Sequence, residues 1–332
     1  MTRLSSFRAS SLGLAALTLC HLLPTAVAAQ ASSSGQAPAL AGERCSVQGL
    51  MDQIRLGLGS KSEAYKRYLK TLLRESAVTL PDAELRAAFD RETDPVMAEH
   101  LAAALVARTE RGADPSAMQA VAKRALEERD PAVRAATVRA MRRTSATEST
   151  GDMYERLVRD SSPEVRMEAA TNLVEDNKYV YAGQLGSVAD SAVAAAAAAT
   201  DPKVTAKILG ELSTEKISAD SASRIKSLLG SDNAEVRKAA ATALGGVPAA
   251  EMASARESLI AMYRGERDTG VRKALLQSIA QLGFSGAVPE LQRLRSVDPS
   301  LASEIDTWTR VLNLGLQEWS LILREKQRLQ AP

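Results

Sequence analysis

A short helix-starting phrase recurs along this chain, and this repetition restricts the fold more than any other feature of the sequence. Its fullest copy is Asp130-Pro131-Ala132-Val133-Arg134. Asp130 can accept hydrogen bonds from the free N–H groups of a first helical turn, and Pro131 fits the first helical position, where a missing N–H costs nothing. The other copies begin at Asp94, Ser162, Asp201, Asn233, Asp268 and Asp298. Self-similarity at a period of about 20–50 residues is typical of stacked helical repeats.

Core-type residues follow each phrase at the spacing of one helix face. Val133, Thr137 and Met141 lie at positions i, i+4 and i+8. The equivalent triplets are Met97/Leu101/Leu105, Val165/Ala169/Leu173, Val204/Ile208/Leu212, Val236/Ala240/Leu244, Val271/Leu275/Ile279 and Leu301/Ile305/Thr309. Successive triplets are 30 to 39 residues apart, which leaves room for two short helices and two turns. No window shows the alternation expected of β-strands, so we predict an all-α fold, an α-solenoid of about seven antiparallel helix pairs.

The repeated residues resemble a known family. Asp-Pro-x-Val-Arg followed by Ala-Ala and Leu is similar to the HEAT repeat, in the bacterial variety first noted in phycobilisome-lyase-like proteins. The stretch with the fullest resemblance is Ile279-Ala280-Gln281-Leu282-Gly283 followed by Gly286-Ala287-Val288-Pro289-Glu290-Leu291, and the resemblance covers residues 80–310. It implies that the arginine after valine and the helix-opening aspartate form a ladder between repeats. This assigns a structural role to Arg134, Arg166, Arg237 and Arg272, whereas Ala98, Thr205 and Ala302 should break the ladder.

The first residues have the pattern of a secretory signal peptide. A positively charged start is followed by an apolar stretch at 12–23 and by small residues at 26–28. The apolar stretch is short for a membrane span, which needs about 20 residues. A lipid anchor at Cys20 is disfavoured because Leu19 precedes it, where a small residue is expected. We therefore expect export to the periplasm, the cell surface or the medium, with no membrane span after signal cleavage.

The rest of the chain divides into a linker and the solenoid. Residues 30–44 are rich in Ala, Ser, Gly, Gln and Pro and cannot bury enough apolar surface to order themselves. The predicted organisation is a signal peptide at 1–29, a flexible linker at 30–59 and a HEAT-like solenoid at 60–332.

Both ends of a repeat array expose a neighbour face and need capping. We predict an N-terminal cap helix at 60–76, with Tyr65, Leu69 and Leu72 on one face. We predict a C-terminal cap helix at 304–330, which contains both tryptophans of the chain.

The charge balance bears on the class of partner. Arg3 and Arg8 are the only charged residues before position 30, and removing them from the 42 basic residues leaves as many as the 40 acidic ones. A neutral mature chain argues against a nucleic acid or an anionic membrane as partner, because phosphate binding depends on excess Lys and Arg.

Few residues remain for metal or nucleophilic chemistry. The predicted mature chain has Cys45 as its one cysteine and His100 as its one histidine. Zinc sites and Ser-His or Cys-His catalysis need clusters of these residues, so we expect no catalytic, metal or cofactor site. His100 is read as structural or solvated. Cys45 is either an incidental residue or an intermolecular or reactive thiol.

Second helices line one face of a HEAT array, and positions two and six beyond each triplet start should point away from the core. From these positions we take the candidate protein-binding face Glu99, Arg139, Met167, Thr171, Lys238, Thr242, Lys273 and Gln277. Lys238 and Lys273 make its C-terminal half mildly basic, which fits either an acidic partner or ordinary solvated helix faces. The C-terminal cap with Trp308 and Trp319 is a second candidate docking surface, and packing against the last repeat is the alternative.

Together these features predict an exported, non-catalytic HEAT-repeat protein that acts as a protein-binding or assembly scaffold in the cell envelope. The resemblance also suggests an alternative, an enzyme-like or cofactor-handling protein related to bilin lyases. The single mature histidine and the export signal do not support that alternative. A DNA-repair solenoid would need a basic, aromatic-lined groove, which the sequence lacks.

Overall fold

The regular elements of this chain are helices, as predicted from the sequence. The computed structural model describes residues 46–60 and 62–330, and within these ranges there is no strand. The all-α prediction is therefore confirmed. The predicted signal peptide, the linker up to residue 45 and Cys45 itself lie outside the described residues.

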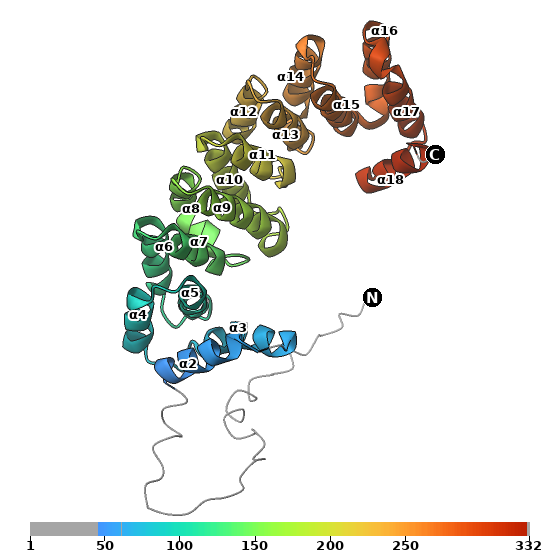
Figure 1. Cartoon of the computed structure of the whole chain (residues 1–332). Helices are drawn as coiled ribbons and strands as arrows, with labels where there is room; N and C mark the ends of the chain where they lie inside the picture. Colours follow the sequence, from blue (N-terminus) through green and yellow to red (C-terminus); the bar gives the residue numbers. More distant parts are fainter. Residues whose placement is uncertain (1–45, 61, 331–332) are drawn as a thin grey trace, which may run out of the picture. The chain divides into compact units, whose positions relative to one another are not determined.

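Seven consecutive helix pairs occupy most of the described chain, each with a first and a second helix. The pairs are α4 (Asp82–Arg91) with α5 (Pro95–Glu110), α6 (Ala117–Glu127) with α7 (Pro131–Ala140), α8 (Ala146–Leu157) with α9 (Pro163–Glu175), α10 (Gly186–Ala198) with α11 (Pro202–Glu211), α12 (Ala219–Leu228) with α13 (Ala234–Leu244), α14 (Met252–Gly265) with α15 (Thr269–Gly283), and α16 (Val288–Val297) with α17 (Ala302–Leu312). Each second helix from α5 to α17 packs on the next, and the first helices α6 to α14 pack on one another in the same way (Figure 1). The array therefore has a first-helix layer and a second-helix layer.

The recurrent phrase works as a helix cap. The Asp130 carboxylate accepts a hydrogen bond from the N–H of Ala132 at 2.9 Å, and Asp94 accepts one from Met97 at 2.9 Å. Side chains of Asp201, Asn233, Asp268 and Asp298 do the same in their copies. Ser162 makes no such bond. There the carboxylate of Asp160, two residues earlier, accepts the Ser162 N–H at 2.7 Å.

The triplets that follow the phrases form the core between the two layers. All of their members are buried except Thr309, which is half-buried. Alanines of the first-helix layer supplement them, notably Ala189, Ala192 and Ala196 of α10. Small side chains allow neighbouring helices to approach closely, so the alanine-rich run is a packing surface.

The N-terminal end differs from the prediction. Residues 47–58, assigned above to the flexible linker, form helix α2 (Val47–Leu58), so the linker prediction is wrong there. Ser46 caps this helix, and Val47, Leu50, Met51 and Ile54 are buried at helical spacing. The composition of the low-complexity segment before it suggests a linker, and this amphipathic stretch is short, so the linker prediction extends over it.

The cap helix is α3 (Glu63–Ser76), which packs on α2. A Cβ on Gly57 of α2 would lie 2.2 Å from the Cδ1 atom of Leu69, so this glycine permits the close contact. Leu69 and Leu73 are the buried residues of α3, whereas Leu72 is half-buried and Tyr65 is 43% exposed. The buried face of α3 therefore contains Leu69 and Leu73, and of the three predicted residues only Leu69 belongs to it.

The C-terminal end also differs, because the predicted single cap helix is two helices. Helix α17 ends at Leu312, and α18 (Trp319–Gln330) begins after a turn. Gly315 in that turn has a φ of +71°, a conformation that glycine adopts at no steric cost. Short 3-10 turns at Ala249–Glu251, Phe284–Ala287 and Pro299–Leu301 and a π-helical turn at Asp176–Val180 complete the described elements.

Candidate functional site

The outward positions of the second-helix layer form the predicted binding face, and its N-terminal part is an ion-pair network. The Arg139 guanidinium lies 3.0 Å from a carboxylate oxygen of Glu99, 2.9 Å from Glu168 and 3.3 Å from Glu164. Arg142 also pairs with Glu168. Burial disfavours the charged form of Arg139, but the hydrogen bonds that its guanidinium donates to Glu168 and Glu99 outweigh this effect and raise its pKa. The network joins α5, α7 and α9, and its charges are already satisfied within the chain.

The middle of the predicted face offers few groups to a partner. Met167 is half-buried and packs against the core. The Thr171 hydroxyl is also half-buried, and it donates to the Met167 carbonyl at 2.9 Å. Neither side chain projects from the surface, so this part of the predicted face offers a partner its surface shape more than specific side-chain contacts.

The C-terminal part of the face is more open. Lys238, Thr242 and Lys273 are exposed, and Gln277 is half-buried. We call these four residues the basic patch. The Lys238 ammonium is 3.6 Å from Glu235, whose side chain is 72% exposed. Lys273 has no ion pair within the described ranges. Because α13 and α15 pack side by side, the patch combines two lysines with an amide and a hydroxyl.

The tryptophans of the C-terminal cap are packed together. Trp308 is 0% exposed, and its ring stacks on that of Trp319 at 5.6 Å between centroids and 5° between planes. Phe284 meets Trp319 edge-on at 6.3 Å, and the Lys326 ammonium lies 4.6 Å from the Trp308 ring centre while pairing with Glu304 at 2.8 Å. Trp308 is therefore a core residue that a partner could reach only after displacing α18. The docking prediction is wrong for this residue.

The four predicted ladder arginines each bridge to a carboxylate in the next repeat. Arg134 contacts Asp160 at 2.7 and 2.9 Å. The other pairs are Arg166 with Asp201 at 2.9 Å, Arg237 with Glu266 at 2.7 and 3.0 Å, and Arg272 with Asp298 at 2.6 Å. Asp201 and Asp298 are the helix-opening residues that the resemblance implied. Asp160 and Glu266 instead lie two residues earlier.

That earlier acidic position was missed in the sequence, although a signal for it exists. Glu92, Glu128, Asp160 and Glu266 each precede a helix-opening residue by two positions and accept its backbone N–H. Each of these four carboxylates also forms an ion pair with an arginine side chain. Where Ala98 interrupts the ladder, Arg124 of α6 pairs with Glu128 at 3.1 Å. At Thr205, where the ladder arginine is replaced, the hydroxyl donates to the Ala196 carbonyl at 3.0 Å.

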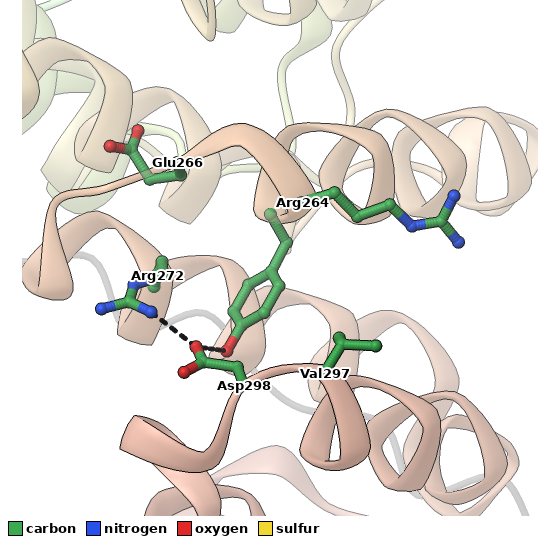
Figure 2. Close-up of a pocket in the computed structure, with 6 residues that line it drawn as sticks. Arg264, Glu266, Arg272, Val297 and Asp298 are labelled. Atoms are coloured by element: carbon green, nitrogen blue, oxygen red, sulfur yellow. Dashed lines mark hydrogen bonds and ion pairs between the residues drawn. The ribbon is translucent and has the colours of Figure 1, made fainter.

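One pocket, of about 270 Å³, lies next to the last ladder pair (Figure 2). The Tyr263 hydroxyl donates to Asp298 at 2.7 Å, and Arg272 donates to the same carboxylate oxygen at 2.6 Å. Burial and the nearby Asp298 raise the pKa of Tyr263, so the phenol stays protonated. Arg264 at the rim points away from this group (Figure 2). Tyr263 and Arg272 both hydrogen-bond to Asp298 in this pocket, and this group of three supports a structural role.

The described residues contain no group of three or more His, Cys, Asp and Glu side chains arranged to hold a metal ion. His100 is buried within α5 and interacts with a neighbouring group. Within the same part of the chain, no helix is both long and apolar enough to cross a membrane.

Comparison with known proteins agrees with the repeat fold. Residues 189–280, which include parts of three helix pairs from α10 to α15, match the family model described as HEAT repeats, which confirms the predicted resemblance there. No curated protein matches the sequence.

Solved structures show likeness at low sequence identity. The YibA protein of E. coli is 14% identical, with 84% of this chain and 99% of that chain covered and a TM-score of 0.39. Human deoxyhypusine hydroxylase in complex with glycerol is 17% identical, with 79% and 94% covered and a TM-score of 0.27. An engineered protein is 17% identical, with 84% and 97% covered and a TM-score of 0.28.

Proposed function

We propose that this chain is a non-catalytic helical-repeat scaffold that binds another protein through its second-helix layer. One observation carries the proposal. The second helices α5 to α17 pack in an unbroken row, and outward positions of α13 and α15 present the exposed basic patch. Stacked repeats of this kind form extended surfaces suited to protein partners.

The difference in ion pairing between the two ends of the predicted face agrees with a binding function for the basic patch. The charges around Arg139 are already paired within the chain. Among the described residues, by contrast, Lys273 has no ion-pair partner and Lys238 has one exposed neighbour, Glu235, at 3.6 Å. Lysines that are not engaged can pair with carboxylates of a partner, and such complementarity favours encounter and orientation. We therefore assign the main contact to this patch.

The proposal includes export. The charged start, apolar stretch and small residues of positions 1–29 support cleavage after Ala28 or Ala29 and action in the periplasm or at the cell surface. Cell fractionation, with the mass of the mature N-terminus, tests this part. An uncleaved chain in the cytoplasmic fraction would contradict it.

The binding proposal is tested by affinity recovery of the tagged full-length protein from its host after mild cross-linking. The test variant is Lys238→Glu/Lys273→Glu, and the matched control is Lys123→Glu, whose side chain is 73% exposed on α6 of the first-helix layer. We expect a stoichiometric partner with the wild type and the control, and about tenfold less with the double variant. Recovery of no partner by a folded wild-type protein would overturn the proposal.

A further inference from the structure

The longest interval between triplets, from Val165 to Val204, contains a segment that departs from the repeat. After α9 the chain forms the π-helical turn Asp176–Val180, and Ala182 then adopts a φ of +50°. We call residues 176–185 the Tyr179 loop. π-helical turns are rare and are found frequently at functional sites.

Unfavourable backbone conformations gather around this loop. Among the described residues, three that are not glycine have positive φ, and Arg143 and Ala182 are two of them. The Arg143 N–H donates a hydrogen bond to the Asp176 carboxylate at 2.7 Å, so Arg143 is attached to the loop that contains Ala182. Such conformations persist only where surrounding contacts fix them, and they concentrate at active and binding sites.

Buried polar side chains fix the loop from below. Asp176 and Asn177 are both 0% exposed. The Asn177 side-chain oxygen accepts the Ser213 N–H at 3.1 Å, so the loop is attached to the end of α11 as well as to the end of α7. The Asn177 side-chain nitrogen is buried without a hydrogen-bond partner in the described structure. Burying polar groups in this way is unfavourable, and packing of the repeats alone does not require it.

The part of the loop that faces solvent is apolar and cationic. Tyr179 is 57% exposed and Val180 is 37% exposed. The Arg143 guanidinium lies 4.6 Å from the Tyr179 ring centre and the Lys178 ammonium lies 5.4 Å from it. Arg143 is also held by Glu175 at 2.7 Å. Neither the Tyr179 hydroxyl nor the Lys178 ammonium has an acceptor within residues 46–60 and 62–330.

We propose that the Tyr179 loop is a docking point for an acidic segment of the partner protein. An apolar side chain of that segment would pack on Tyr179 and Val180, while a neighbouring carboxylate would accept hydrogen bonds from Lys178 and from the Tyr179 hydroxyl. Tyrosine and arginine are enriched among residues that dominate binding energy at interfaces. This inference rests on the proposed scaffold function and names the charge of the partner.

Carboxylates fit this surface better than phosphates do. The chain from position 30 onward has as many acidic as basic residues, whereas nucleic-acid binding relies on a broad excess of cations. The lysines of the basic patch would meet the same acidic partner at a second place. A protein segment with Asp or Glu beside an apolar residue satisfies both surfaces.

Site-specific photo-cross-linking in the host tests the proposal with the full-length chain. The photoreactive amino acid p-benzoylphenylalanine replaces Tyr179, Lys273 or, as the control, Tyr68, which is 50% exposed on α3. We expect a discrete adduct from position 179 and none from position 68, with Asp or Glu in the cross-linked peptide. Adding Lys178→Glu, which changes an exposed side chain, should reduce the adduct at position 179 about tenfold.

Each other outcome has a separate meaning. An adduct at position 273 without one at 179 would overturn the docking point and leave the scaffold function standing. Adducts at none of the positions would overturn both. A nucleic-acid adduct, or a cross-linked peptide without carboxylates, would overturn the acidic-partner assignment. An unchanged yield with Lys178→Glu would overturn the assigned contact.

Discussion

Arg134 and Asp160 form a two-point ion pair between consecutive repeats, with Nε–Oδ2 and Nη2–Oδ1 distances of 2.9 and 2.7 Å. Their side chains are only 9% and 12% exposed. The Arg134 guanidinium also donates to the carbonyls of Glu128 and Arg129 before its own helix. The pair therefore fixes the entry to α7 and connects it to the next repeat.

Asp160→Asn should destabilise the protein by about 2 kcal/mol, because it removes the negative charge and leaves the buried guanidinium poorly compensated. The amide oxygen can still accept the Ser162 N–H, so the helix cap is kept. Urea unfolding followed by circular dichroism measures the change. Glu127→Gln is the control, because Glu127 is 62% exposed and 4.0 Å from Lys123. The control should change stability by less than about 0.5 kcal/mol, and equal effects of the two variants would contradict the role given to the pair.

The ladder also predicts that acid weakens the protein. Hydrogen bonds from Arg237 lower the pKa of Glu266 below its ordinary 4.5, and those from Arg166 lower the pKa of Asp201 below 3.8. A carboxyl group with a depressed folded-state pKa stabilises the fold above its unfolded value and loses that contribution as pH falls through the folded value. Stability should therefore be constant near neutrality and decline below about pH 4.5.

Glu266→Gln separates this effect from general acid unfolding. The variant should be less stable than the wild type at pH 7, and the difference should shrink as the pH falls below the ordinary pKa of Glu266. Urea midpoints at a series of pH values measure both curves. Curves that stay parallel down to low pH would show that Glu266 has no depressed pKa.

The repeat architecture was predictable because its causes are local. Asp130 and Pro131 set a helix start, and Val133 begins a face with helical spacing, so three short-range signals agree. These local signals predict the positions of the second helices. The family resemblance then predicts the four ladder arginines. The acidic position at Glu266 follows equally local rules, but it precedes the phrase, so the phrase itself does not indicate it.

The remaining features depend on contacts between distant residues. The Tyr179 loop exists because Asp176 meets the backbone of Arg143 and Asn177 meets that of Ser213, and no local periodicity reports such pairings. Helix α2 follows a segment whose composition suggested a linker. The spacing of Trp308 fits either exposure on a docking surface or burial, and only the position of α18 decides between them.

The stacked tryptophans provide a measurement of whether α18 stays docked. Trp308 is 0% exposed beneath α18, whereas Trp319 is half-buried. We expect Trp319→Phe to leave an emission that is blue-shifted and weakly quenched by acrylamide, and Trp308→Phe to leave one that is quenched more strongly. Trp308→Ala should cost about 3–5 kcal/mol because it empties a core position. Equal quenching of the two single-tryptophan proteins would show that α18 does not cover Trp308.

Two glycines with the same backbone conformation separate backbone strain from crowding. Gly112 and Gly183 have φ values of +71° and +70°. A Cβ at Gly112 would meet nothing within 4 Å, whereas one at Gly183 would lie 2.4 Å from the Ser213 Oγ atom. Gly112→Ala should therefore cost roughly 1 kcal/mol, the left-handed penalty alone.

Gly183→Ala should cost more, about 2–3 kcal/mol, because the added methyl also pushes the Tyr179 loop away from the end of α11. Urea unfolding of both variants measures the difference. Hydrogen exchange should show the N–H of Ser213, which donates to Asn177, losing protection in Gly183→Ala and keeping it in Gly112→Ala. If the two variants had equal stability and equal exchange at Ser213, the loop would not be packed against α11 in the way that holds Tyr179 in place.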